Sequence, residues 1–148
     1  MNIAVHTVGR LKALPGEPEV AGFVDNIPAV FSVAERSDGF IWRFNRLTNP
    51  EHMAEFEAYV GDAALAVTLS VWESVEKLNH YVFKTLHGRF YDRKDEWFHP
   101  PGEAMFVLWR VPEGHEPTLA EAGSRLAHLR THGPSDHAFD WTYADGPR

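Results

Sequence analysis

The chain has no cysteine, and this absence excludes three kinds of chemistry. Disulfide bonds, zinc sites built on thiolates and thiol nucleophiles all require the missing side chain. Several longer motifs are also missing, because no GxGxxG, P-loop, GxSxG or HExxH pattern occurs anywhere in the chain. Nothing in the sequence therefore binds a nucleotide through a known motif.

Positive charge and long apolar runs are scarce. The chain has 14 basic and 21 acidic residues, a formal net charge of -7, and no basic stripe. This balance argues against a nucleic-acid partner. No apolar run is long enough to span a bilayer, and the first residues lack the pattern of a signal peptide. We therefore expect a cytoplasmic protein without a membrane partner.

Aromatic residues and histidine are abundant by contrast. The 148 residues include five Trp, four Tyr, ten Phe and nine His, and 44% of the chain is hydrophobic. The length indicates a single domain over 1–148 with enough apolar material for a core. Aromatic side chains either fill cores or line ligand pockets, and composition does not distinguish the two.

Hydrophobic periodicity predicts alternating strands and helices. Strands are expected over 2–8, 40–45, 65–72 and 104–111, and helices over 20–34, after Ser74, and from Thr118 to a stop at Gly133 and Pro134. Pro28 should kink the first helix. Thr118 and Glu121 match a capping box. The segment 46–64 is expected to form a short helix or an ordered loop, and part of the tail a final strand.

This β-α-β-β-α-β order, followed by a helix, predicts an α+β ferredoxin-like fold. The core would span about residues 2–111, with the C-terminal helix and tail at 117–148. Two helices would cover one face of the sheet and leave the other face bare and apolar. Because such a patch is too large for a monomer, we expect a homodimer with facing sheets, which is a dimeric α/β barrel.

His80, Lys84 and His87 recur at helical spacing, so they form either a solvated stripe or a pair of histidines of which one faces a pocket. We favour His87 as a functional residue, because it lies at the helix end, where Gly88 allows a close approach. Arg43 lies within an aromatic strand and needs a partner if it is buried. A structural ion pair and an anion-binding role are equally favoured there.

Other side chains are candidates for the wall of a substrate pocket. His6 shares a strand face with Ala4 and Val8, where a core histidine is more common than a catalytic one. The aromatic candidates are Trp42, Trp72, Tyr81, Phe83, Trp97 and Trp109. His128 and His132 have the spacing of a metal-binding pair, but no His-Glu signature accompanies them and Gly133 ends the helix, so no metal site is predicted.

The stretches "SDGFIWRF", "LSVWESVEKLNHYV", "EWF" and "LWRVPEGHEPTLAEAGSRLAHLRTHGP" resemble the family DUF3291. The block from Val111 to Pro134 is the most specific part, and the likeness extends to about Phe139. The resemblance implies the dimeric α/β-barrel superfamily, which also holds antibiotic-biosynthesis monooxygenases, haem-degrading oxygenases, chlorite-dismutase-like enzymes and small-ligand stress proteins. Several of its haem proteins place the axial histidine on or after the second helix, where this chain has His87.

One segment departs from the family pattern. Between the second and third strands, where family members tend toward Gly, Asn and Thr, this chain has Met53, Phe56 and Tyr59. The segment 46–64 is therefore a candidate lid.

These observations predict a cofactor-independent enzyme that acts on a hydrophobic small molecule in an aromatic-lined pocket, in specialised metabolism. It would be an oxygenase, or an isomerase or cyclase, in which His87 moves a proton and Arg43 stabilises an enolate or carboxylate oxygen. Two alternatives stay open, namely a haem protein with His87 as axial ligand and a non-catalytic ligand-binding or stress domain.

Overall fold

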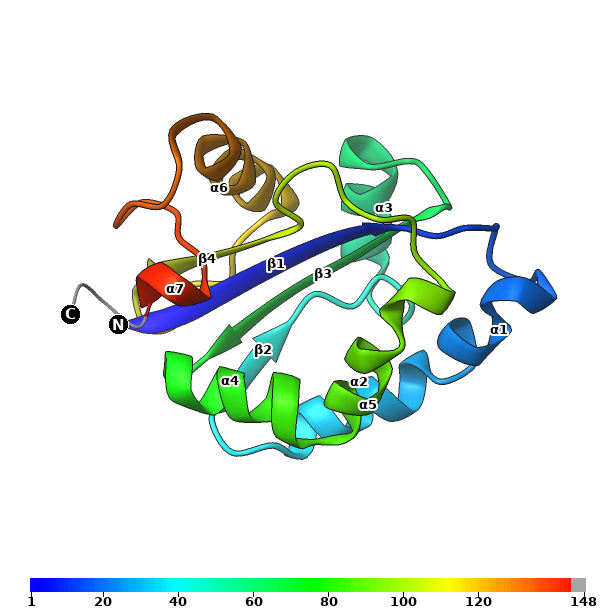
Figure 1. The fold of residues 1–148 in the computed structure, drawn as a ribbon. Helices are drawn as coiled ribbons and strands as arrows, with labels where there is room; N and C mark the ends of the chain where they lie inside the picture. The colour runs from blue at the N-terminus through cyan, green and yellow to red at the C-terminus, as the bar shows by residue number, and fades with distance from the viewer. Residues whose placement is uncertain (145–148) are drawn as a thin grey trace.

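A computed structural model describes residues 1–144, apart from the side chain of Leu86. Its four strands form one antiparallel sheet in the order β2-β3-β1-β4 (Figure 1). The strands are β1 (Asn2–Arg10), β2 (Phe40–Arg43), β3 (Leu65–Trp72) and β4 (Phe106–Val111). The two long central strands pair from Ile3 opposite Trp72 to Arg10 opposite Leu65. This strand order confirms the predicted ferredoxin-like fold.

Helices lie on both sides of the sheet (Figure 1). They are α1 (Pro18–Val24), α2 (Ile27–Arg36), α3 (Pro50–Tyr59), α4 (Val75–Lys84), α5 (Leu86–Asp92), α6 (Leu119–His132) and α7 (Trp141–Ala144), with a 3-10 turn η1 (Lys94–Glu96). We call the side toward α2 and α4 the α4 face, and the side toward α3 and α6 the α6 face.

The helix predicted over 20–34 is in fact two helices. Proline lacks an N–H group and clashes with the preceding turn, so it is tolerated in a first turn and disfavoured in a helix interior. Pro28 accordingly lies in the first turn of α2, and α1 ends at Val24.

The helix that follows Ser74 also breaks. Ser74 caps α4 as predicted, with Oγ accepting from the N–H of Lys77. Thr85 is extended, and its Oγ1 accepts from the N–H of His87, so α5 begins with a cap of its own. A Cβ on Gly88 would lie 2.7 Å from the carbonyl oxygen of Phe83. The close approach expected at Gly88 is therefore present.

Strand β2 is shorter than expected and contains a bulge at Ile41. Regular alternation along the strand expected over 40–45 predicts Phe40, Trp42 and Phe44 on one face, and this prediction is wrong. A bulge inserts one residue and reverses the alternation after it, so Phe40 packs on the α4 face whereas Trp42 and Phe44 pack on the α6 face.

The sheet face that was expected to be bare is covered within the chain. Apolar residues of α6 pack on the α6 face, and α3 adds Phe56 to the same cluster. The segment 46–64 thus supplies a helix that packs into the core. Because the bare face was the physical reason for expecting a homodimer, that reason no longer holds, and the homodimer stays a prediction.

The tail lies against the far edge of the sheet. Phe139 exchanges two backbone hydrogen bonds with Leu108, of 2.8 and 2.9 Å. The expected final strand is therefore reduced to one bridge, and the last four residues of the predicted domain fall outside the described part. Within residues 1–144, no helix has the length and apolar character needed to cross a membrane.

Candidate functional site

The nine residues predicted for the site do not come together. Four of them, Arg43, Trp72, Tyr81 and His87, lie on the α4 face or on the helices that cover it. His6, Trp42 and Trp109 belong to the opposite, α6 face. The sheet separates the two groups, so they do not share one pocket.

The residues on the α6 face are packed into the core. His6 is 5% exposed, and its Nδ1 lies 2.8 Å from the carbonyl oxygen of Thr68. Burial lowers the pKa of His6, so its ring is neutral near pH 7. Trp109 is fully buried and donates from Nε1 to Glu121 at 2.8 Å. Trp42 lies edge-on to His52 of α3.

The two remaining aromatic candidates lie elsewhere. Trp97 is buried in a separate cluster with Leu11 and Val20, at the end of the sheet near α1. Phe83 is 39% exposed, and its ring is 5.8 Å from that of Trp141 on α7. Trp97 is outside the group around His87, whereas Phe83 is linked to it through Tyr91, whose ring is 5.5 Å from that of Phe83 and 6.4 Å from that of His87.

The α4-face group is linked by direct contacts. Trp72 stacks on Tyr81 with ring centroids 4.9 Å apart, and Tyr81 is 5.0 Å from His87. The positive charge of Arg43 acts on the Tyr81 hydroxyl, although burial is the larger effect and raises the pKa of Tyr81. Tyr81 therefore stays protonated at physiological pH, and its hydroxyl donates to the carbonyl of Val30 at 3.4 Å.

His87 has a neutral ring with one nitrogen that can accept a proton. Its Nδ1 is 3.0 Å from the carbonyl oxygen of Val82, and a carbonyl only accepts, so Nδ1 carries the proton. Nε2 then has a free lone pair. Burial lowers the pKa of His87 and outweighs this hydrogen bond. His80, expected to share a face with His87, is exposed, and the break at Thr85 places the two residues on different helices.

Arg43 is a partly buried cation, and the one hydrogen bond of its guanidinium among the described residues is the 3.4 Å bond that a terminal N–H donates to the carbonyl of Phe44. Its side chain is 14% exposed, and Nε is 3.6 Å from a carboxylate oxygen of the half-exposed Glu35. This separation is too long for a hydrogen bond, and the buried Nε has no other partner among the described residues. The guanidinium also lies 4.1 Å from the centre of the Phe31 ring. The structure therefore combines a loose ion pair with an unused N–H donor.

Three polar residues of the α4 face were missed as site candidates. We call Thr7, Thr68, Ser70 and Arg43 the polar band. Thr7 and Thr68 lie opposite each other with Oγ1 atoms 2.5 Å apart, and Ser70 is opposite Arg43. Ser70 accepts from the indole N–H of Trp72 at 3.0 Å, which ties the band to Tyr81 and His87. Side chains alternate along β3, so the sequence pattern by itself puts Thr68, Ser70 and Trp72 on one face.

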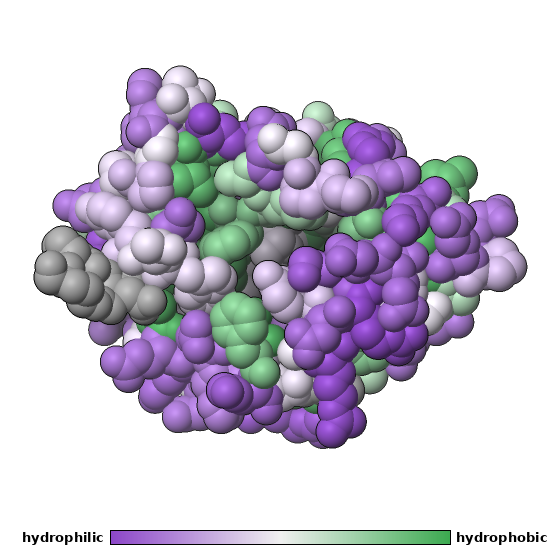
Figure 2. All heavy atoms as spheres, viewed as in Figure 1, coloured by the Kyte–Doolittle hydropathy of each residue, from purple (hydrophilic) through white to green (hydrophobic). Residues whose placement is uncertain are grey.

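The polar band is open to solvent even though helices cover this face. Thr7, Thr68 and Ser70 are partly exposed. The apolar clusters at either end of the band are buried. Trp72 and Leu108 are buried at one end, and Leu11 and Trp97 at the other. Figure 2 shows hydrophobic residues gathered around a hollowed area in the middle of the visible face, ringed by hydrophilic ones.

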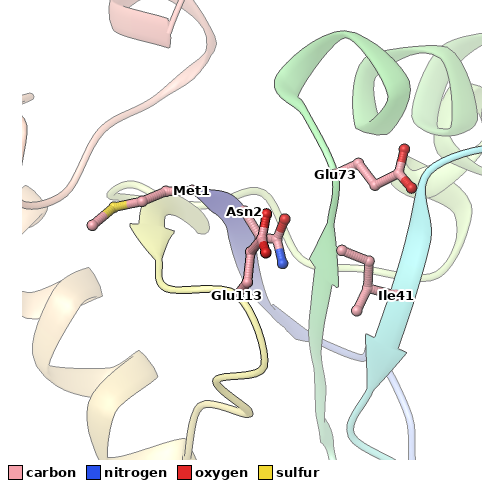
Figure 3. Close-up of a pocket in the computed structure, with 5 residues that line it drawn as sticks. All are labelled: Met1, Asn2, Ile41, Glu73 and Glu113. Atoms are coloured by element: carbon pink, nitrogen blue, oxygen red, sulfur yellow. The ribbon is translucent and has the colours of Figure 1, made fainter.

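Two hollows lie away from this group. One, of about 570 Å³, is lined by Met1, Asn2, Ile41, Glu73 and Glu113 (Figure 3). It has two carboxylates, of which Glu73 already pairs with Lys77 at 2.7 Å. The other, of about 380 Å³, is lined by residues that include Arg130 and Glu103, which pair with each other at 3.2 Å. Neither hollow is lined by a histidine.

His128 and His132 are adjacent, with ring centroids 4.6 Å apart, and His137 is equally close to His128. In residues 1–144, no group of three or more His, Cys, Asp or Glu side chains is placed to hold a metal ion.

Comparison with known families decides the relationship suggested by the sequence. The model of the family described as domain of unknown function DUF3291 matches residues 2–147. The chain belongs to DUF3291. No curated protein matches this DUF3291 chain.

Solved structures show the same fold at low sequence identity. A conserved protein from Methanosarcina mazei Go1 aligns with a TM-score of 0.51 and 12% identity, over 76% of this chain and 94% of that one. An antibiotic biosynthesis monooxygenase-like protein from Nitrosomonas europaea aligns with a TM-score of 0.54 and 10% identity, over 78% and 94%. The DUF3291 chain thus shares the ferredoxin-like fold of these proteins.

Proposed function

We propose that this DUF3291 protein is a cofactor-independent enzyme that removes a proton from carbon in a hydrophobic, oxygen-containing small molecule. The observation that carries the proposal is the partly exposed polar band on a helix-covered face, which includes the cation Arg43 and is linked through Trp72 and Tyr81 to the neutral His87. Apolar walls with a few convergent polar groups are typical of small-molecule sites. The fold shared with the monooxygenase-like protein of Nitrosomonas europaea supports the same class.

His87 is the base in this proposal. Nε2 takes the proton, while the bond from Nδ1–H to the Val82 carbonyl fixes the tautomer and the ring orientation. Tyr81 packs against the imidazole of His87. Because the Tyr81 hydroxyl stays protonated, the base of this pair is Nε2 of His87. Removal of a positioned base typically costs about 100- to 10,000-fold in rate.

Arg43 stabilises the charge that forms on the substrate. Loss of the carbon proton leaves an enolate, whose negative oxygen pairs with the guanidinium of Arg43, a side chain that is 14% exposed. An oxygenase then needs only molecular oxygen as co-substrate. The enolate transfers electrons to oxygen, a carbon hydroperoxide forms, and loss of water leaves a carbonyl. An isomerase or cyclase shares the first step and returns the proton to another carbon, or closes a ring.

Anthrone is a suitable probe, because it is flat and apolar and its methylene carbon is acidic. Under argon in deuterated water, nuclear magnetic resonance measures exchange of the methylene hydrogens, which reports the proton step alone. An oxygen electrode then measures conversion of anthrone and oxygen to anthraquinone and water. Exchange with oxygen uptake supports an oxygenase, and exchange alone supports an isomerase or cyclase.

The variants His87→Gln and Arg43→Met test the two roles, and His80→Gln is the matched control, since His80 is exposed on the neighbouring helix. We expect His87→Gln to lose exchange and His80→Gln to retain it. Exchange at the wild-type rate in both His87→Gln and Arg43→Met would contradict the assigned roles. Binding of anthrone without exchange or uptake would favour the non-catalytic ligand-binding alternative.

A second candidate, haem binding, is supported by one observation. Metal-bound histidines commonly donate their second N–H to a backbone carbonyl, as His87 does to Val82. His87 would hold the iron through Nε2, and haem would supply redox chemistry there. An absorption spectrum with and without added haem tests this candidate. A Soret band that shifts on binding and is lost in His87→Gln would establish it and exclude His87 as a free base.

A further inference from the structure

The paired hydroxyls of Thr7 and Thr68 have no role in the proton chemistry above. We infer that this pair is a second anchor of the site, which donates a hydrogen bond to a neutral oxygen at the far end of the substrate. The inference rests on the proposed function and adds the substrate class. The ligand would be a flat, fused-ring molecule with an acidic oxygen at Arg43 and a carbonyl or hydroxyl oxygen at the threonine pair.

The hydrogen-bond inventory of the pair leaves one donor free. With Oγ1 atoms 2.5 Å apart, one hydroxyl donates to the other. Each hydroxyl has one hydrogen, so the accepting threonine keeps a hydrogen for which the described part of the chain provides no partner. Both threonines are partly exposed, so a ligand can reach that hydrogen.

The positions of the two anchors set the length of the ligand. Thr68 and Ser70 are two residues apart on β3, which separates them by about 6.6 Å along the strand. Arg43 lies opposite Ser70 on β2, and Thr7 lies opposite Thr68 on β1. The anchors therefore start from different strands, with backbone positions at least that far apart, and this spacing suits oxygen atoms at opposite ends of a two-ring skeleton better than neighbouring oxygens on one ring.

The charges of the polar band suit a ligand that has one acidic end and one neutral end. Arg43 supplies a cation whose nearest carboxylate, on Glu35, is half-exposed and 3.6 Å away. The threonine end has hydroxyls only. A carboxylate or enolate should therefore lie at Arg43, and an uncharged oxygen at the threonines.

A structural explanation of the pair makes a different prediction. Threonines directly opposite each other stabilise antiparallel sheets through their mutual hydrogen bond. If that were their whole role, removal of both hydroxyls would lower the melting temperature without changing the choice between ligands. The test must therefore compare two ligands that differ in one oxygen.

The probes are 6-hydroxy-2-naphthoate and 2-naphthoate, which share a carboxylate and differ only in the distal hydroxyl. Binding is measured by quenching of tryptophan fluorescence, which needs no turnover. Because 1.4 kcal/mol corresponds to a tenfold change in affinity and a hydrogen bond contributes about 0.5–1.5 kcal/mol net, we expect the wild-type protein to prefer the hydroxylated probe by roughly 3- to 10-fold.

In Thr7→Val/Thr68→Val this preference should disappear, while the affinity for 2-naphthoate stays within about twofold, since only one hydrogen bond is removed. Thr7→Ser/Thr68→Ser restores hydroxyls and should restore the preference. Thr131→Val, an exposed threonine on α6, is the control. If the valine variant does not fold, the affinities of the wild-type protein for the two probes decide alone. The proposed anchor requires the wild-type protein to bind the hydroxylated probe more tightly.

Three outcomes overturn the inference. One is equal affinity of the wild-type protein for both probes, and another is a preference that survives in the folded valine variant. In either case binding that Arg43→Met abolishes would leave the proposed site intact. The third is no binding of either probe, and anthrone exchange then shows separately whether the proposed function stands.

Discussion

Tyr81 and His87 contact each other across a break in their helix, with ring centroids 5.0 Å apart. On one continuous helix, six steps of about 100° would place the two side chains on different faces. Thr85 ends α4 and caps α5, so the chain turns and His87 comes back beside Tyr81. The local break thus creates the contact on which the proposed base depends.

Gly88 should be essential to that turn. In Gly88→Ala the new Cβ would lie 2.7 Å from the backbone oxygen of Phe83, and such overpacking typically costs about 1–3 kcal/mol. Gly123→Ala is the control, because a Cβ there meets no atom within 4 Å on the helix α6, and alanine in a helix gains about 0.5–1 kcal/mol over glycine. Chemical denaturation should show a lower free energy of unfolding for Gly88→Ala and a higher one for Gly123→Ala. Equal effects would show that the close approach at Gly88 is relieved without cost.

Stability should fall on acidification. Burial lowers the pKa of both His6 and His87 in the folded protein, so below about pH 6.5 the unfolded chain binds more protons than the folded one. The free energy of unfolding therefore has its full value above that pH. It decreases as the pH falls from there toward the pKa values that the two histidines have in the folded protein. Denaturation curves between about pH 7.5 and pH 5 measure this slope.

His87→Gln removes one of these two buried imidazoles and should flatten the dependence of the free energy of unfolding on pH. A wild-type free energy of unfolding that is constant across this window would contradict the burial of the two rings.

Glu121 should matter more to stability than the predicted capping box implies. Thr118 accepts from the N–H of Glu121 as expected, but the carboxylate of Glu121 binds elsewhere, to Trp109 at 2.8 Å and His115 at 2.7 Å. Glu121→Ala leaves the fully buried indole N–H of Trp109 without an acceptor, which costs about 1–3 kcal/mol. Thr118→Ala should cost about 1 kcal/mol, as for other lost caps. Urea denaturation measures the free energy of unfolding of both variants and of the control Glu116→Ala, which changes an exposed residue. A cost for Glu121→Ala no greater than that of the control would show that Trp109 finds another partner.

The predicted homodimer is tested by the mass in solution. The resemblance to dimeric α/β-barrel proteins predicts twice the chain mass, whereas the cover provided by α3 and α6 on the second sheet face removes the need for a facing sheet. Light scattering coupled to size exclusion gives the mass directly. A single-chain mass at all concentrations would overturn the homodimer.

The sequence alone determined the elements that depend on local pattern. The alternation in β3 predicted Leu65 to Trp72 as a strand, with the bounds that the structure has, and the serine before α4 predicted its start. These signals are local because side chains alternate along strands and caps bond to neighbouring N–H groups. The order of the elements then restricted the fold to the ferredoxin-like arrangement.

Only the tertiary structure decided which distant residues meet. The sequence named His6, Arg43 and His87 together, but the alternation of β1 directs His6 to the α6 face, on the other side of the sheet from the helices that carry His87. The bulge at Ile41 moved Trp42 away from Phe40, and the cover of the second face by α6 came from packing between residues far apart in the chain. Such contacts depend on non-local burial, which periodicity does not encode, and so the polar band of Thr7, Thr68, Ser70 and Arg43 became visible only when three strands were placed side by side.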